Sequence, residues 1–510
     1  MTDVTLEYGL KRLGLKQEYK REFSLQASFC LSFVIMSPFV GVADNLGYSW
    51  YIGGPGAVIW GWKVVSLMTL CTGLSLAEIL SGLPCSGGPY YWTSLLGGRH
   101  GALLSYITGW CNLVGLMTLT AGSAVATMYN VVGIVQILTG VALSTGYQVF
   151  ILQGVLVASG LVNCASPTFL TRCMYYGAFI NVAGVISVVL LLPTVGPWRQ
   201  SPKFVWGTFF DRSMSPFTVP SNAYLWIQGA GLALFTLAGF DSCSHLSEEI
   251  KGANSAAPLA MLWSILATSV IGFALLLGLL FCVQDPDNLF NPQDAGEGYA
   301  AGQLVFDVFK RRFGSGTGCV SVLLIFFLGG AMCTIACVTS TSRMMFAFAR
   351  SRALPFSCYF SRMSPRQHMP VRTVWLAVLF ACAFTTILLV PGSFALVNMI
   401  SFGFAGMQLA HGLPILCRLT ISRHTFVPGP IHLGRYSGVI GWISVAWVIV
   451  SMIVLSIPPS IPVTADGFQM PLLIAVVGSL AAWYCPWVGA RHTYIDPKRQ
   501  AASANLAVRH

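Results

Sequence analysis

Three acidic residues fall within the long apolar stretches of this sequence: Asp44, Glu78 and Asp241. A carboxylate at the centre of a membrane-spanning helix costs roughly 2.5–3.5 kcal/mol on insertion scales, so such a residue is kept where it faces a cavity, a partner or a solute. Asp241 is the strongest candidate, because it ends a break, Leu237-Ala238-Gly239-Phe240, in the middle of an apolar run. Its carboxylate can handle a solute or a proton, and it can also cap the half-helix that follows.

A second break, Met36-Ser37-Pro38-Phe39-Val40-Gly41, interrupts an apolar run near the start of the chain. Paired helices interrupted by Gly or Pro at corresponding positions are how secondary transporters expose backbone groups to cargo. Free N–H groups at a helix start favour an anion such as a carboxylate. Free carbonyls and the Asp241 side chain favour an ammonium, so the two breaks together suit a zwitterion such as an amino acid.

The remaining acidic residues have weaker claims to solute contact. Asp44 lies toward one end of its span, where an interfacial position is expected. Glu78 is predicted to be a packing or gating partner for a loop cation. Glu248 and Glu249 are predicted to form a gate or ion pairs with Arg343 or Arg350, the alternative being solvation at the membrane interface.

Polar and aromatic side chains supply further candidates. Asn181, Thr339 and Ser340 are predicted to coordinate a coupling ion or to join helices through hydrogen bonds. Aromatic faces attract organic cations, and four aromatic residues could line a pocket or pack against lipid and neighbouring helices: Trp110, Trp226, Phe235 and Phe240. His245 and His411 stand alone in the sequence and are predicted to be hydrogen-bonded packing residues. We find no motif of a hydrolase, metalloprotease or nucleotide-binding enzyme, and so predict no enzyme activity.

Composition identifies the class of protein. Of the 510 residues, 55% are hydrophobic and 9% are charged, whereas soluble domains carry about 25% charged residues. The chain is therefore a polytopic membrane protein with the lipid bilayer as its partner. The net charge of +11 comes from basic residues in short loops and at the termini, so nucleic-acid binding is not expected. The 15 cysteines lack metal-type spacing, and neither a metal nor a cofactor is predicted.

Apolar runs of about 20 residues predict twelve membrane spans, at 24–49, 56–82, 101–132, 147–164, 173–196, 222–249, 258–284, 316–349, 373–391, 393–417, 437–459 and 468–488. Lys and Arg gather in the loops that share a side with the N-terminus, which predicts that both termini are cytosolic. The plasma membrane is favoured over internal membranes.

The chain divides into a transporter domain, 24–488, between cytosolic tails at 1–23 and 489–510. Because each half begins with a broken helix, we predict an inverted repeat of 24–196 and 222–417, followed by two further helices within 437–488.

Five stretches of this sequence resemble the eukaryotic amino acid/choline transporter family of the amino acid–polyamine–organocation superfamily, and they follow one another in the family's order. This family includes GABA and choline permeases and bidirectional amino acid transporters. The five stretches are Gly53-Gly54-Pro55 with Trp60-Gly61-Trp62; Ser75-Leu76-Ala77-Glu78-Ile79 with Gly87-Gly88-Pro89-Tyr90-Tyr91-Trp92 and Gly109-Trp110-Cys111-Asn112; Gly239-Phe240-Asp241 with His245-Leu246-Ser247-Glu248-Glu249; Ser342-Arg343-Met344 with Phe348-Ala349-Arg350 and Ala353-Leu354-Pro355; and Pro428-Gly429-Pro430 with Leu433-Gly434-Arg435.

The resemblance implies an all-α, leucine-transporter-type fold of about twelve helices with a central site between helices 1, 3, 6, 8 and 10. It also implies that the substrate-facing breaks are Ile35, Met36, Ser37, Pro38, Phe39 and Val40 in helix 1 and Leu237, Ala238, Gly239, Phe240 and Asp241 in helix 6. Pro38 and Pro89 depart from the family pattern, and Pro38 removes an N–H that could hold a carboxylate. The sequence thus predicts a secondary transporter of amino acids, possibly of GABA, with H⁺ or Na⁺ coupling; the alternative is a choline or polyamine permease of the same fold.

Overall fold

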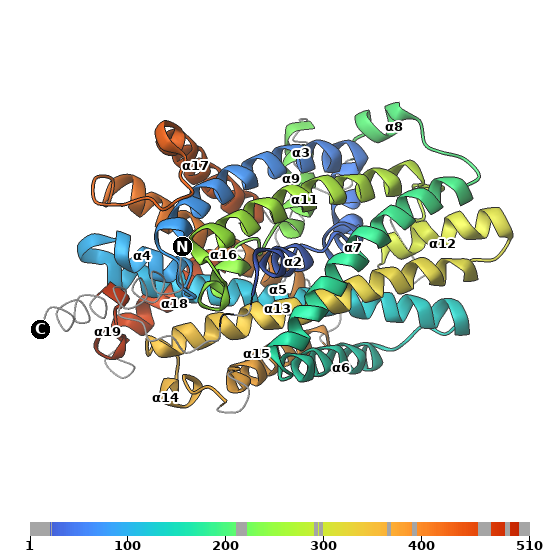
Figure 1. Cartoon of the computed structure of the whole chain (residues 1–510). Coiled ribbons are helices and arrows are strands. Elements are labelled where there is room, and N and C mark those ends of the chain that lie inside the picture. Colours follow the sequence, from blue (N-terminus) through green and yellow to red (C-terminus); the bar gives the residue numbers. More distant parts are fainter. Residues whose placement is uncertain are drawn as a thin grey trace, which may run out of the picture.

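The helices of this computed structural model form a membrane bundle in which two spans are broken near their middle (Figure 1). The structure describes residues 21, 23–210, 222–289, 294, 299–364, 369–389, 395–456, 471–484 and 490–498. The predicted tails fall largely outside these residues, as do residues 211–221 and 457–470. Nine helical segments in the described part are long and apolar enough to cross a membrane.

All twelve predicted spans coincide with helical segments. The first six are α2 (Leu25–Ile35) with η1 (Phe39–Ala43) and the start of α3 (Asp44–Gly82), the rest of α3, α5 (Gly101–Thr139), α6 (Thr145–Asn163), α7 (Pro167–Val195), and α9 (Asn222–Thr236) with α10 (Ser242–His245). The second six are α11 (Ala253–Phe281), α13 (Val320–Arg350), α15 (Val371–Thr385), α16 (Ala395–Thr420), α17 (Ser437–Ser456) and α18 (Pro471–Tyr484).

Short helices occupy links that the hydropathy pattern left unassigned. They are α4 (Pro89–Leu96), α8 (Pro202–Gly207), α12 (Ala300–Phe313), α14 (Ser357–Phe360) and α19 (Ala490–Thr493). Figure 1 shows α4 and α19 at one end of the bundle, which we call the terminal end, and α8 and α12 at the other, which we call the opposite end. Pro89 occupies the first turn of α4, where its missing N–H has no intrahelical partner to lose.

The first two spans differ from the prediction because no loop separates them. α3 runs from the second half of span 1 into span 2 and kinks at Gly54, whose φ is 73° and ψ is −176°. The segment after α8 supports this kink: the Gly56 N–H donates to Thr208 O (2.9 Å) and the Phe210 N–H donates to Gly53 O (3.3 Å). A side chain at Gly54 would also meet Phe210, so glycine is required on steric and conformational grounds.

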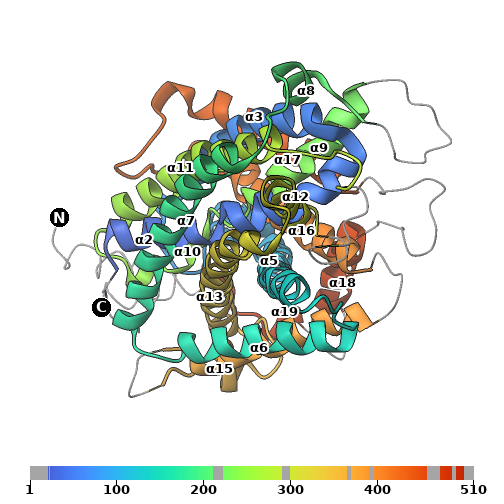
Figure 2. The ribbon, with the colours of Figure 1, turned by 90° about the vertical axis from the view of Figure 1, so that its right-hand side faces the viewer.

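Long helices form the frame around the two breaks. α5 packs against α13 and α16, and α3 packs against α9 and α11. The end view shows α5 and α13 side by side, with α6 and α15 covering one flank (Figure 2). The largest cluster of buried apolar side chains includes residues of both breaks, such as Ile35, Phe39 and Phe240, and two smaller clusters lie apart from it.

Candidate functional site

The first break is stabilised by neighbouring helices. α2 ends at Ile35, and after Ser37 and Pro38 the chain continues as the π-helix η1. The Ser37 hydroxyl donates a hydrogen bond to Asn181 Oδ1 on α7 (2.7 Å), and Cys333 Sγ on α13 donates to Ile35 O (3.2 Å). These bonds partner groups that a continuous helix would have satisfied internally.

The second break depends on glycine. α9 ends at Thr236, residues 237–241 form turns, and α10 starts at Ser242. Gly239 has φ 79°, a conformation that costs other residues about 1–2 kcal/mol. A Cβ on Gly239 would lie 2.7 Å from Ile35 Cγ2 and 2.9 Å from Leu119 Cδ2. The second break is therefore pressed against the first break and against α5.

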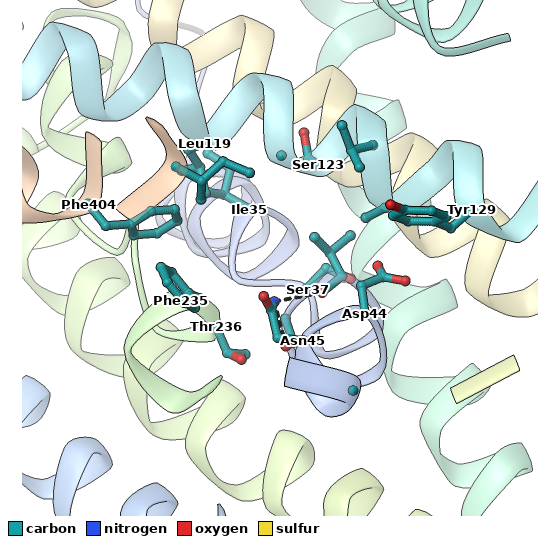
Figure 3. Close-up of a pocket in the computed structure, with 17 residues that line it drawn as sticks. Ile35, Ser37, Asp44, Asn45, Leu119, Ser123, Tyr129, Phe235, Thr236 and Phe404 are labelled. Carbon is teal, nitrogen blue, oxygen red and sulfur yellow. Dashed lines mark hydrogen bonds between the residues drawn. The ribbon is translucent and has the colours of Figure 1, made fainter. Parts of the chain in front are cut away.

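A cavity of about 250 Å³ lies where the two breaks face α5 and α16. Figure 3 shows Phe235 and Phe404 at one side, Asp44 and Tyr129 at the other, and Ser37 and Asn45 between them. Its seventeen lining residues are Ile35, Ser37, Val40, Gly41, Asp44, Asn45, Gly47, Leu119, Gly122, Ser123, Val125, Ala126, Tyr129, Phe235, Thr236, Ile400 and Phe404. They come from helices 1, 3, 6 and 10 of the implied fold.

Asp44 is the acidic side chain in this lining. Its two carboxylate oxygens are buried without a hydrogen-bond partner among the described residues. Tyr299 lies beside it, and its hydroxyl donates instead to Asn130 Oδ1 (2.8 Å). Burial, with a further contribution from the Asp44 carboxylate, raises the pKa of Tyr299 well above its usual value, so its hydroxyl keeps its proton. The Asp44 side chain thus faces the interior of the bundle, while its expected position near the membrane interface stays a prediction.

Only part of the predicted substrate-binding set lines the cavity: Ile35, Ser37 and Val40. The Phe39 ring points elsewhere, lying 5.2 Å from the Phe326 ring on α13. Leu237, Ala238 and Phe240 line a separate, water-sized cavity next to His411. Met36, Pro38, Gly239 and Asp241 line neither cavity.

The surroundings of Asp241 differ from those predicted. Asp241 occupies the N-cap position of α10, but its side chain makes no capping hydrogen bond. Its Oδ2 lies 3.5 Å from His245 Nε2 and 3.3 Å from His411 Nε2. The two histidines are therefore not isolated from each other as the sequence suggested, because His411 reaches the same carboxylate from a distant part of the chain; their role as packing residues stays a prediction.

The predicted ion pairs of the acidic residues are present at the terminal end. Glu248 Oε1 lies 2.7 Å from Arg350 Nη2, and Glu249 Oε1 lies 3.2 Å from Arg343 Nε. Both pairs join the end of helix 6 to α13. Glu78 on α3 pairs with Arg418 on α16 (3.0 Å) and accepts a hydrogen bond from Ser437 on α17 (2.7 Å).

The remaining polar and aromatic candidates have different surroundings. Thr339 donates to Asn163 Oδ1 on α6 (2.6 Å), while the buried Ser340 hydroxyl has no partner in the described part of the chain. Phe235 and Phe404 form an edge-to-face pair with ring centroids 4.8 Å apart. Trp110 packs against Phe348, outside the cavity, and the side chain of Trp226 lies outside the described residues.

Comparison with known proteins identifies the family. The sequence pattern described as "Amino acid permease" matches residues 23–480. The amino-acid permease BAT1 of Arabidopsis thaliana is 34% identical over 499 residues, which cover 96% of this chain and 95% of that protein. The chain belongs to the amino acid permease family. The rice homolog of BAT1 is also 34% identical, covering 96% of this chain and 94% of its own length. The GABA-specific permease of Saccharomyces cerevisiae is 27% identical, covering 88% and 78%.

Family membership confirms the all-α membrane fold and the resemblance to the amino acid–polyamine–organocation superfamily. It supports an amino acid transporter, a membrane protein acting on a small molecule, rather than an enzyme. Sequence reasoning missed Asn45, Ser123, Tyr129, Thr236 and Phe404 in the cavity lining. Asn45 and Thr236 directly adjoin the two breaks and could have been included on that ground; Tyr129 and Phe404 carried no such signal.

Proposed function

We propose that this permease is a secondary transporter that carries a small amino acid through the cavity between the two helix breaks by alternating access. The observation that carries this proposal is a cavity of about 250 Å³ lined by Ile35, Ser37 and Val40 of the first break and by Phe235 and Thr236, which immediately precede the second break. Pockets for drug-sized ligands measure roughly 300–1,000 Å³, so this volume suits a compact solute better than an extended polyamine. Its lining combines a carboxylate, hydroxyl and amide groups with two aromatic rings.

The two charges of an amino acid have complementary partners here. The Phe39 and Val40 N–H groups stand at the start of a helix and favour a carboxylate, whereas the Gly41 N–H donates to Ser37 O (2.9 Å). Asp44, one turn further along, offers an unpaired carboxylate for the ammonium. We therefore assign the ammonium contact to Asp44 in place of Asp241. Ser37 and Val40 contact the carboxylate side, and Phe235 and Phe404 enclose the side chain.

The ion pairs at the terminal end form the inner gate of this mechanism. Arg350–Glu248 and Arg343–Glu249 join helix 6 to helix 8, and helices 1, 2, 6 and 7 rock against helices 3, 4, 8 and 9 in the proposed cycle. Opening the gate separates these pairs. Glu78 with Arg418 closes the same end between α3 and α16. In this orientation the terminal end faces the cytosol, both tails are cytosolic, and the plasma membrane is the site of action.

Asn181 and Thr339 have a structural role in this proposal, and Ser340 has a different one. Asn181 holds Ser37 at the first break, and Thr339 joins α13 to Asn163 on α6. A hydroxyl or amide occupied in this way stabilises the frame around which the other helices move. Of the three, Ser340 is the one with an unpartnered hydroxyl that can contact a coupling ion.

Uptake into proteoliposomes tests the proposal. The panel consists of labelled amino acids, GABA, choline and putrescine, each measured with wild-type protein and with Asp44→Asn. Saturable uptake of amino acids, reduced at least tenfold by Asp44→Asn, is expected. The matched control is Asp287→Asn, at an exposed carboxylate of the opposite end, which should transport at the wild-type rate. Uptake confined to choline or putrescine would contradict the proposal and support the alternative, in which Asp44 and the aromatic pair hold an organic cation.

A further inference from the structure

Three titratable side chains from two helices meet behind the second break. Asp241, His245 and His411 are at most 1% exposed. The carboxylate oxygen Oδ2 of Asp241 lies between the two Nε2 atoms, 3.5 Å from His245 and 3.3 Å from His411. Nδ1 of each histidine has no hydrogen-bond partner among the described residues. The cluster thus contains one acid and two bases with unused proton-binding capacity.

Among the described residues, the neighbouring elements supply no other charged side chain to the cluster. α5 contributes Asn112, whose Nδ2 lies 3.4 Å from His245 Nε2. α2 contributes Ser32 and α11 the Ala257 carbonyl, both bonded to Cys243, the other titratable neighbour of Asp241. α16 contributes His411 with Gln408, and α3 contributes Thr69. The nearest charges along the chain, Glu248 and Glu249, form ion pairs with α13.

Because no other charge of the described residues is close, the number of protons bound to the cluster determines its net charge. With both histidines neutral, an ionised Asp241 is a bare charge in the membrane interior, which is strongly unfavourable. Adding one proton to either histidine makes the cluster neutral, and a second proton makes it positive. The histidines can bind a proton near neutral pH, and binding one proton cancels the charge of the Asp241 carboxylate. The cluster is therefore suited to bind and release a single proton.

A water-sized cavity lies beside His411 and shares one lining residue with the substrate cavity. It measures about 10 Å³ and is lined by His411, Gln408, Thr69, Phe240 and others, which is room for about one water molecule. Phe404 lines both this cavity and the larger one. The Phe404 side chain, whose ring pairs with that of Phe235, therefore contacts both spaces. A solute that displaces Phe404 changes the surroundings of His411.

We propose that Asp241, His245 and His411 form a proton-binding site, separate from the substrate cavity, that takes up and releases one proton in each transport cycle. The inference rests on the proposed transport function. The proton enters from solution onto a histidine nitrogen, is held beside the Asp241 carboxylate and leaves from the same nitrogen to solution on the other side. Phe404 couples its release to the presence of the solute.

The test uses the full-length protein in proteoliposomes with the amino acid found by the uptake panel. Two rates are measured: exchange of labelled for unlabelled solute without a gradient, and accumulation driven by an imposed pH gradient. For His411→Gln and His245→Gln, we expect the ratio of gradient-driven accumulation to exchange to fall at least tenfold. The matched control is His424→Gln, at an exposed histidine, for which the ratio should stay at the wild-type value.

A second readout reports the proton itself. Purified protein in weakly buffered detergent solution with a pH-sensitive dye should take up or release about one proton per molecule when the solute is added, and the two variants should not. Folding of each variant is checked by its thermal unfolding curve. If a variant fails to fold, the test is instead the pH dependence of the ratio of gradient-driven accumulation to exchange, measured with the wild-type protein.

Each outcome has a definite meaning. A wild-type protein that exchanges amino acids but ignores the pH gradient overturns the proton site and leaves the transport function intact. Histidine variants with the wild-type ratio and wild-type proton release overturn it as well. A wild-type protein that exchanges no amino acid overturns the transport function and, with it, the proton site.

Discussion

The two ends of the bundle hold their ion pairs in different environments. At the terminal end, the Arg343 and Glu249 side chains are 0% and 4% exposed. At the opposite end, Arg311 and Asp285 lie 2.8 Å apart, but their side chains are 36% and 32% exposed. A buried pair has strong coupling and a large penalty for losing one partner, whereas an exposed pair is weakened by water and salt. The comparison indicates that the terminal end is locked and that the opposite end is easier to open.

The largest effect is expected from removing one partner of the buried pair. Arg343→Ala leaves the Glu249 carboxylate buried and should lower the free energy of unfolding by about 3–5 kcal/mol. Thermal and denaturant unfolding of the purified protein measure this loss. The double variant Arg343→Met with Glu249→Gln removes both charges and should regain most of the stability. An Arg343→Ala variant as stable as the wild type would contradict the proposed difference between the two ends.

A smaller effect is expected at the Glu78–Arg418 pair of the same end. Glu78→Gln weakens the bonds from Arg418 and Ser437 and should cost about 1.5–3 kcal/mol. The loss should be below that of Arg343→Ala, because the Arg418 side chain is 11% exposed and can be partly hydrated. Denaturant unfolding of both variants under one condition checks the order, and a reversed order would show that burial does not set the strength of these pairs.

The exposed pair should matter little. Arg311→Ala is expected to change the free energy of unfolding by about 0.2–1 kcal/mol. Part of that change arises from the lost contact between the guanidinium and the Trp198 ring, whose centroid lies 5.0 Å away. A loss as large as that of Arg343→Ala would show that the opposite end is locked as well.

The smallest expected effect is a change in the coupling energy of the ion pairs when the salt concentration is raised. Raising the ionic strength from about 0.1 M to 1 M shortens the Debye length from about 10 Å to 3 Å. The coupling energy between Arg311 and Asp285, measured by a double-mutant cycle, should fall toward zero. The coupling between Arg343 and Glu249 should change little, because ions do not reach a buried pair. Equal salt sensitivity at both ends would contradict the comparison.

Sequence predicted the spans and the two breaks because both depend on local properties, namely apolar length and the placement of Gly and Pro. The Glu248 and Glu249 pairs with Arg350 and Arg343 were also predictable, since few charges were available to partner a carboxylate at that depth. α4, α8 and α12 were missed because they are shorter than a span and lie in loops. Their helical character depends on contacts with neighbouring helices, such as those that α8 makes with α3.

The site itself was predicted less well than the fold. A break can be read from sequence, but the direction of a side chain next to it cannot. Asp44 enters the cavity and Asp241 does not, although Asp241 looked the more central of the two. His411 approaches Asp241 from α16, 170 residues further along the chain, and no local pattern indicates such a contact. The assignments of substrate and proton contacts therefore stay predictions until the variants are measured.

The π-helix at Phe39–Ala43 has a consequence for insertions and deletions in this chain. Each residue of an α-helix turns the following side chains by about 100°, and a π-helix arises when one extra residue is accommodated in the turn. Deleting Val42 would remove one residue from this turn and change the angle between the lining residues before it, Val40 and Gly41, and those after it, Asp44 and Asn45, without removing any residue that lines the cavity. The length of this segment, as much as its chemistry, therefore determines which side chain the solute meets, and a one-residue gap here in an alignment would carry more meaning than a substitution.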